Sequence, residues 1–259
     1  EHLSRALRTS GFYVLRSGWD ADATVMVLKA GPQGFWHCQP DNGTFELWHR
    51  GRNFFPDSGS YVYAGDKEVT DQRNWFRQTR VHNTVTLDDR DLEKTDSKLL
   101  LWDTTPALTT LVTENPSYEG LTHRRTVWFV DRRFFVIADE ASGTAGGEVS
   151  LHYNLVECDP AEDAAAGSAA TRFDDGNNLL LKVFGAERME RREGWVSRTY
   201  RQRTERPAYA FTVRKRAGKP VRLVTVLLPA EDAEAQRVEA VWHGNRLQVK
   251  INGTKYNLK

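Results

Sequence analysis

Short stretches of alternating apolar and polar residues recur from one end of the chain to the other. In the stretch 44–50, TFELWHR, Phe45 and Leu47 fall on one face while Glu46 and Trp48 fall on the other, as in a half-buried β-strand. Comparable stretches occur at 11–17, 23–30, 82–88, 98–103, 107–114, 148–157, 178–184, 194–201 and several times after residue 208. Roughly fifteen such stretches without a regular repeat period predict an all-β fold. We expect a large antiparallel β-sandwich, with two or more stacked sheets, in a single domain over residues 11–259.

The segments between these stretches contain two clear turn signals and few helix signals. Asp131-Arg132-Arg133 separates two apolar stretches and predicts a hairpin, and Asn252-Gly253 predicts a two-residue hairpin near the C-terminus. Residues 1–10 place Leu3 and Leu7 four positions apart, which predicts a short helical stub or the end of a linker. The Ala-rich stretch 160–172 and the stretch 229–240 are further candidates for a turn or two of helix.

Composition excludes some partners without identifying one. The 259 residues are 39% hydrophobic and 27% charged, and the net charge of +1 gives no argument for binding nucleic acid or a membrane surface. No apolar run approaches the roughly 20 residues that span a bilayer. Cys38 and Cys158 either form one disulfide or stay reduced, so the cysteines do not fix the redox compartment.

Three clusters of polar residues carry the candidate chemistry, namely HCQPDNG at 37–43, FFPDSGSYVY at 54–63 and RNWFRQTRVHNTVTLDD at 73–89. His37 opens the first cluster, and an imidazole exchanges protons near neutral pH. Pro40 and Gly43 predict a rigid loop after it. The same pattern also fits a half-buried histidine at the end of a strand, which motif chemistry alone favours.

The side chains of Gln39, Asp57 and His82 combine an amide oxygen, a carboxylate and an imidazole, which is a plausible mixed ligand set for a divalent metal. Their spacing matches no helical metal-binding motif. Asp57 lies in an Asp-Ser-Gly stretch that is equally typical of an ordinary turn.

Basic and aromatic residues are interleaved in the third cluster, at Arg73, Trp75, Phe76, Arg77 and Arg80. Guanidinium groups form bidentate hydrogen bonds with carboxylate and sulfate, and aromatic rings stack on the apolar faces of sugars. Together with the amide of Asn83, the three arginines are candidate substrate-binding residues for an anionic polysaccharide. A solvated charged loop explains the pattern equally well.

Taken together, the clusters resemble a known family. FWHCQPDNGTFELWHRGRNFFPDSGSYVY, RNWFRQTRVHNTVTLD and RRTVWFVDRRFFVIADEASG resemble, in the same order, the C-terminal β-sandwich of the heparinase II/III-like polysaccharide lyases. The resemblance covers most of the first 160 residues and is strongest to the branch that cleaves heparan sulfate. It implies β-elimination, in which a base removes the C5 proton of a uronic acid and the 4-O-glycosidic bond breaks.

The resemblance also assigns roles to the candidate residues. It implies that His37 is the catalytic histidine of the sandwich and that Gln39, Asp57 and His82 hold one structural divalent metal. Gln39 stands where the family often has a histidine, so calcium and manganese are candidates beside zinc. The substrate would be an anionic polysaccharide of the heparan sulfate type, and the enzyme would be periplasmic or secreted by a bacterium.

The family's remaining catalytic groups come from an N-terminal α/α toroid, and no part of this chain has the pattern of a toroid. Tyr61 and Tyr63 do not match the family's catalytic tyrosine. We therefore expect this chain to hold part of an active site and to show no turnover alone. Two other functions stay open at this point, a non-catalytic module that binds anionic glycans and a lyase for another uronate polymer such as alginate.

Overall fold

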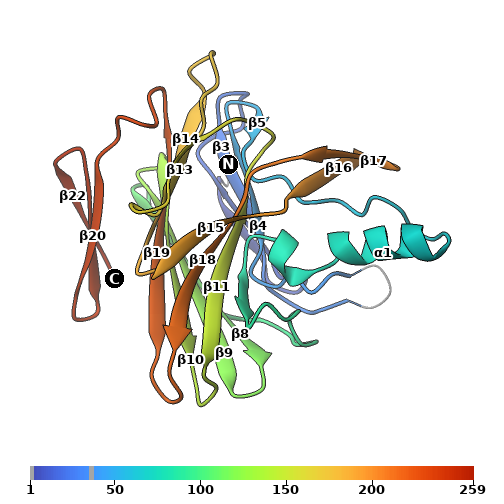
Figure 1. The fold of residues 1–259 in the computed structure, drawn as a ribbon. Helices are drawn as coiled ribbons and strands as arrows, with labels where there is room; N and C mark the ends of the chain where they lie inside the picture. Colours follow the sequence, from blue (N-terminus) through green and yellow to red (C-terminus); the bar gives the residue numbers. More distant parts are fainter. Residues whose placement is uncertain (1–2, 35–37) are drawn as a thin grey trace.

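The computed structural model describes residues 3–34 and 38–259, which form three layers of antiparallel strands (Figure 1). An eight-stranded sheet is the middle layer. Its strands, in order across the sheet, are β12 (Ala161–Asp163), β13 (Ser168–Ala170), β14 (Asn178–Phe184), β19 (Val221–Ala230), β10 (Phe134–Ser142), β9 (Leu121–Val130), β8 (Leu108–Tyr118) and β7 (Lys98–Thr104).

Part of the middle sheet is buried on both faces, which explains the continuous apolar stretches in β9 and β10. In β9, Val127 and Phe129 belong to one hydrophobic core, whereas Trp128 and Val130 belong to the core on the opposite face. Because successive side chains of a strand point to opposite faces, a strand between two layers needs apolar residues at every position.

Two further sheets cover one face of the middle layer. A five-stranded sheet contains β1 (Arg5–Leu7), β2 (Phe12–Arg16), β3 (Thr24–Lys29), β4 (Phe45–His49) and β5 (Arg52–Asn53), and a four-stranded sheet has the order β15 (Arg188–Arg192), β18 (Ala208–Lys215), β11 (Gly147–Asn154), β6 (Val85–Leu87). Phe45 of the first and Tyr153 of the second pack in the same core as Phe129. This core joins both sheets to the middle layer.

The third layer is a three-stranded sheet near the C-terminus, at the left of Figure 1, made of β20 (Val238–His243), β21 (Arg246–Ile251) and β22 (Thr254–Leu258). Leu247 and Val249 pack against Val136 and Val226 on the outer face of the middle sheet.

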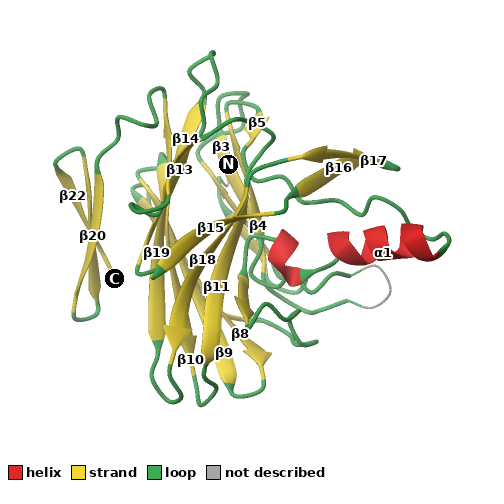
Figure 2. Cartoon of the chain, in the orientation of Figure 1, coloured by secondary structure: helices red, strands yellow, loops and turns green. Residues whose placement is uncertain are grey.

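A helix and a small hairpin project on the opposite side of the molecule (Figure 2). The helix is α1 (Lys67–Phe76), followed by the 3-10 turn η1 (Thr79–Val81), and the hairpin consists of β16 (Trp195–Thr199) and β17 (Gln202–Glu205). Asp66 caps α1 by accepting a hydrogen bond from the Val69 N–H, and Phe76 is the residue that the helix buries. No hydrophobic pattern in the sequence predicts this helix.

The all-β sandwich and both hairpins predicted from the sequence are confirmed. Asp131 and Arg132 have φ values of 49° and 55°, and they connect β9 to β10 in a tight hairpin. Asn252 and Gly253 join β21 to β22. Within the described residues, no helix has the length and apolarity that crossing a bilayer requires.

All three helix predictions are wrong. The stretch 229–240 holds the end of β19, a short turn and the start of β20. The predicted stub over residues 1–10 contains β1 instead, in which Arg5 pairs with Val14 of β2. The Ala-rich stretch 160–172 forms β12 and β13, which turn at Gly167. In the last two stretches pairing with a neighbouring strand outweighs a weak local preference for helix.

Candidate functional site

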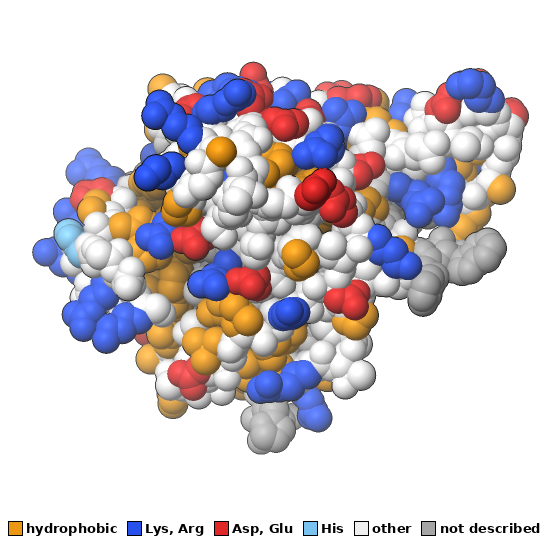
Figure 3. Space-filling view, turned by 90° about the horizontal axis from the view of Figure 1, so that it is seen from below, with side chains coloured by type: hydrophobic (Ala, Val, Ile, Leu, Met, Phe, Trp, Pro, Cys, Tyr) orange, Lys and Arg blue, Asp and Glu red, His pale blue; other side chains and the backbone are white. Residues whose placement is uncertain are grey.

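A hollow of about 260 Å³ lies beside α1 and gathers residues from separate parts of the sequence. It is lined by Gln39, Asp57, Gly59, Ser60, Tyr63, Arg73 and Arg77. Four of the residues that the sequence singled out, two candidate metal ligands and two arginines, therefore share one site. In the space-filling view, basic side chains lie on the lobe that carries α1 (Figure 3).

His82 lies behind this hollow with a fully buried side chain. Its Nδ1 is 2.8 Å from the carbonyl oxygen of Gln78, and because a carbonyl only accepts hydrogen bonds, Nδ1 is the donor. This leaves the lone pair of a neutral ring on Nε2, which is buried without a hydrogen-bond partner and lies 3.5 Å from Oδ2 of Asp57. The imidazole is thus oriented as a metal-binding histidine is.

Asp57 and Gln39 present oxygen atoms to the same place. Oδ1 of Asp57 accepts a hydrogen bond of 2.8 Å from the Gly59 N–H, which orients the carboxylate in its turn. Oε1 of Gln39 is buried and has no hydrogen-bond partner. Gln39 and Asp57 line the same hollow, and the unpartnered buried atoms Oε1 of Gln39 and Nε2 of His82 are groups that a cation would satisfy.

This donor set fits one divalent metal. An imidazole nitrogen with carboxylate and amide oxygens suits Mn²⁺ or Zn²⁺, and the oxygens suit Ca²⁺. In residues 3–34 and 38–259, no three His, Cys, Asp or Glu side chains form a ligand group by themselves. The set therefore depends on the amide oxygen of Gln39.

Arg73 and Arg77 hold their positive charges at the edge of the hollow. Arg73 donates a hydrogen bond of 2.6 Å to the Val62 carbonyl, and its guanidinium lies 5.2 Å from the centre of the Tyr63 ring. Arg77 follows α1 and donates to the Cys38 carbonyl over 3.1 Å. Both guanidinium groups are anchored through backbone carbonyls.

The other two predicted substrate-binding residues lie away from the hollow. Arg80 donates to Oε1 of Gln78 and lies 4.0 Å from the carboxylate of Asp89, outside the lining. Asn83 is buried, and its amide donates to the Phe45 carbonyl and accepts from the Asn154 N–H. Asn83 is 2% exposed, and these two hydrogen bonds hold its amide among the strands, which indicates a structural role instead of substrate binding.

His37, the predicted catalytic histidine, lies outside the described residues. Its neighbour Cys38 donates a hydrogen bond from Sγ to the Gly34 carbonyl. Cys158 is partly buried, and burial raises the pKa of its thiol to about 12. The two cysteines are not joined by a disulfide.

A buried ionic network that the sequence analysis missed supports the loops of the site. Asp139 contacts Arg125 at 2.7 Å and His123 at 2.6 Å, and all three side chains are buried. Burial alone would raise the pKa of Asp139, but the two partners hold it at about 2. Arg125 also donates to the carbonyls of Gly43 and Asn83, so it links the loop after Gln39 to the residue after His82. The sequence signal that could have revealed this network is the presence of charged residues within the strand-forming stretches that contain Arg125 and Asp139.

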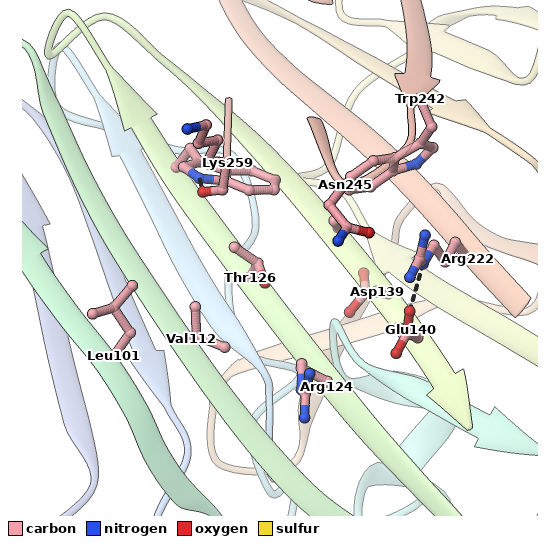
Figure 4. A pocket seen from close by; sticks show the side chains of 12 residues that line it. Leu101, Val112, Arg124, Thr126, Asp139, Glu140, Arg222, Trp242, Asn245 and Lys259 are labelled. Carbon is pink, nitrogen blue, oxygen red and sulfur yellow. Dashed lines mark hydrogen bonds and ion pairs between the residues drawn. The ribbon is translucent and has the colours of Figure 1, made fainter. Parts of the chain in front are cut away.

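A second hollow, of about 300 Å³, lies between the middle sheet and the C-terminal sheet (Figure 4). Its walls are mostly apolar and include Val112, Trp128 and Trp242. Arg222 pairs with Glu140 there. Arg124 similarly pairs with Glu114. None of the residues singled out by the sequence lies in this hollow, and its arginines are already neutralised.

Comparisons with known proteins agree with the resemblance in the sequence. The family described as heparinase II/III-like, C-terminal, matches residues 1–239. A heparin-sulfate lyase from Bacteroides stercoris is 47% identical over 268 residues, which cover 100% of this chain and 40% of the relative. A heparin-sulfate lyase from Pedobacter heparinus is 42% identical over 91% of this chain and 36% of the relative.

Solved structures give the same result. A heparinase III structure superimposes with a TM-score of 0.97 at 48% identity, covering 100% of this chain and 42% of that one. Heparan sulfate lyase HepC from Pedobacter heparinus has a TM-score of 0.95 at 39% identity, over 99% of this chain and 42% of that one. The chain thus spans about two fifths of the length of these relatives. It belongs to the heparinase II/III-like family and corresponds to the family's C-terminal domain.

Proposed function

We propose that this chain is the C-terminal domain of a polysaccharide lyase that cleaves heparan sulfate by β-elimination. The observation that carries the proposal is the hollow beside α1, where Asp57, Arg73 and Arg77 lie together in a chain whose relatives are named heparin-sulfate lyases. A solvated charged loop would not gather these side chains around buried, unpartnered ligand atoms.

The chemistry of β-elimination explains why this hollow needs its arginines. The C5 proton of a uronic acid is weakly acidic, and neutralising the neighbouring carboxylate makes the enolate-like intermediate accessible. Arg73 and Arg77 would supply positive charge to the carboxylate or sulfate groups of the substrate. Since both arginines are held by backbone carbonyls, they are positioned before substrate arrives.

We assign proton transfer to His37. In the sequence it directly precedes Cys38, whose carbonyl is held by Arg77 at the hollow, and it is two residues from Gln39. An imidazole has the ordinary pKa that lets it serve as base or acid near neutral pH. The remaining catalytic groups would come from an N-terminal α/α toroid in the rest of the full-length protein, since this chain spans two fifths of its relatives.

We also propose that Gln39, Asp57 and His82 hold one divalent ion, Ca²⁺, Mn²⁺ or Zn²⁺. Such an ion would supply positive charge that fixes the three loop segments of the site relative to one another. The hydrogen bonds from Gly59 to Asp57 and from His82 to Gln78 orient two of the ligands for this role. A periplasmic or secreted location would suit a polymeric substrate that does not enter the cytoplasm intact.

The test of the catalytic proposal uses the full-length protein that carries this domain. Purified protein is incubated with heparan sulfate or alginate, and unsaturated product is followed by ultraviolet absorbance. We expect turnover of heparan sulfate, and a loss of about 10²–10⁴-fold in kcat/KM in His37→Ala. The matched control is His243→Ala, whose imidazole is exposed on the C-terminal sheet. Glycan binding without turnover in the unaltered protein would favour a non-catalytic binding module. Faster turnover of alginate than of heparan sulfate would refute the proposed substrate.

The metal proposal has its own measurement. Metal content of the full-length protein is determined by mass spectrometry, and the stripped protein is titrated with Mn²⁺, Ca²⁺ and Zn²⁺. We expect one equivalent per chain, lost in Asp57→Asn and His82→Gln. Asp22→Asn, which removes a highly exposed carboxylate, should bind as the unaltered protein does. Binding that survives both ligand substitutions would place the ion elsewhere.

A further inference from the structure

Arg206 is a buried cation that no motif in the sequence singles out. It lies between β17 and β18 and is 2% exposed. Burial lowers the pKa of its guanidinium to about 10, because the buried charge has lost its hydration. Its Nε is buried without a hydrogen-bond partner. Burying a charged group with an unpartnered nitrogen costs free energy, which indicates that Arg206 has a role besides packing.

The contacts of Arg206 converge on the two segments that carry Asp57 and His82. One terminal nitrogen donates to the Pro56 carbonyl, and the other donates to the Ser58 hydroxyl. The second nitrogen also lies 3.5 Å from the Val81 carbonyl. A single guanidinium therefore contacts both chain neighbours of Asp57 and the residue directly before His82.

Ser58 completes the connection. Its buried hydroxyl accepts from Arg206 and donates a hydrogen bond of 2.6 Å to the Val81 carbonyl. The loop that carries Asp57 and the turn that ends at Val81, directly before His82, are thus joined side chain to backbone. Oδ2 of Asp57 and Nε2 of His82 lie 3.5 Å apart.

The β16–β17 hairpin supports the same loop from outside. The Ser197 N–H donates to the Ser58 carbonyl over 2.8 Å, and the Arg201 N–H donates to the Tyr61 carbonyl over 2.9 Å. Arg206 follows this hairpin and donates its own N–H to the Gly194 carbonyl, which closes the base of the hairpin. These backbone hydrogen bonds fix the position of Arg206 relative to the loop that carries Asp57.

We propose that Arg206 is a positioning residue that presets the spacing of Asp57 and His82 for a divalent metal ion. The inference rests on the proposed metal site and adds to it a residue that does not touch the metal. A planar guanidinium reaches several acceptors in fixed directions, whereas an ammonium is a point charge that cannot span them. Lysine should therefore preserve the charge without preserving the geometry.

The test is a binding isotherm for Mn²⁺ on the metal-stripped full-length protein, measured by calorimetry for the unaltered chain, Arg206→Lys and Arg206→Met. Supporting residues behind metal ligands contribute about 10–100-fold in affinity, and we expect a loss of that size for methionine and an intermediate loss for lysine. The matched control is Arg198→Met, which removes from the same hairpin a half-exposed guanidinium that pairs with Glu157. It should bind within about twofold of the unaltered protein.

A second variant keeps the test decisive if Arg206→Met does not fold. Ser58→Ala removes the hydroxyl between Arg206 and Val81 at almost no change in volume, and we expect about a tenfold loss of Mn²⁺ affinity. Circular dichroism with chelator present shows that each variant is folded before titration. Equal affinity in the unaltered, Arg206→Lys and Ser58→Ala proteins would refute the positioning role and leave the metal site standing. An unaltered protein that binds no divalent ion would refute the site itself.

Discussion

The buried imidazole of His152 should make the stability of this fold sensitive to mild acid. His152 lies in β11, with Nε2 2.8 Å from the Thr86 hydroxyl and 3.8 Å from the carboxylate of Asp89. Burial lowers the pKa of His152 to about 4; Asp89 opposes this shift, and Arg192 and Arg80 add to it. The unfolded chain, in contrast, has a histidine with a pKa near 6.5.

The sign of the effect follows from proton binding. Between about pH 6.5 and pH 4 the unfolded chain binds a proton at this position and the folded chain does not, so stability is lost as the pH falls through that window. Because one pKa unit corresponds to about 1.4 kcal/mol, a shift from about 6.5 to about 4 makes a contribution on the order of 3 kcal/mol when fully expressed. Most of this contribution is lost between about pH 7.5 and pH 4.5.

The assay is urea unfolding followed by tryptophan fluorescence at several pH values in this range, for the unaltered chain and His152→Gln. Between about pH 7.5 and pH 4.5 the glutamine variant should lose roughly 2–3 kcal/mol less stability than the unaltered chain, whatever its stability at neutral pH. The buried His123 also has a lowered pKa, but it contributes equally to both proteins and cancels in the comparison. The exposed His243, changed to glutamine, serves as the control. Equal pH dependence in His152→Gln and the unaltered chain would refute the reasoning.

Three further predictions concern the network, the loop and the thiol. Asp139→Asn leaves a buried guanidinium without its carboxylate and should lower the free energy of unfolding by about 3–5 kcal/mol in urea; a loss below about 1 kcal/mol would contradict this. Gly59→Ala should weaken Mn²⁺ binding and lower Tm, because the backbone has φ +79° and a Cβ would lie 2.2 Å from a carbonyl oxygen of the β16–β17 hairpin. Gly51 has a similar φ of +76° but open space around it, so Gly51→Ala is a control that introduces backbone strain without a clash. Equal Mn²⁺ affinities in the two variants would contradict an effect of the clash on the metal site. Cys158, with its raised thiol pKa, should resist iodoacetamide near pH 8 until the chain unfolds, as mass spectrometry would show.

The sheets were predictable because strand periodicity is a local property. Alternation along 44–50 and continuous apolar stretches in β9 and β10 report burial on one face or two, and the structure confirms both patterns. Helix α1 was not predictable in this way, since Phe76 is the residue that it buries and its sequence has no apolar face. Its available signal was the capping residue Asp66.

The site was predictable in its residue types and only partly in its geometry. Gln39, Asp57, Arg73 and Arg77 lie on segments up to 38 positions apart along the chain, and only the packed structure shows that they line one hollow. Asn83, beside His82 in the sequence, turned out to be a buried structural amide. Neighbouring residues in an extended segment point in opposite directions, and the sequence does not say which direction faces the hollow.

Two buried arginines show why the remaining contacts of the site could not be predicted from the sequence. Arg125 lies 82 positions from Gly43, and Arg206 lies 150 positions from Pro56, yet each binds that residue's backbone carbonyl. Every residue has a carbonyl, so such a contact leaves no residue type in the sequence by which to find it. The motif blocks that carry the family resemblance therefore omit the cation behind Asp57 and His82. A relative could keep all three blocks and lose Arg206, and we expect such a relative to bind its metal more weakly.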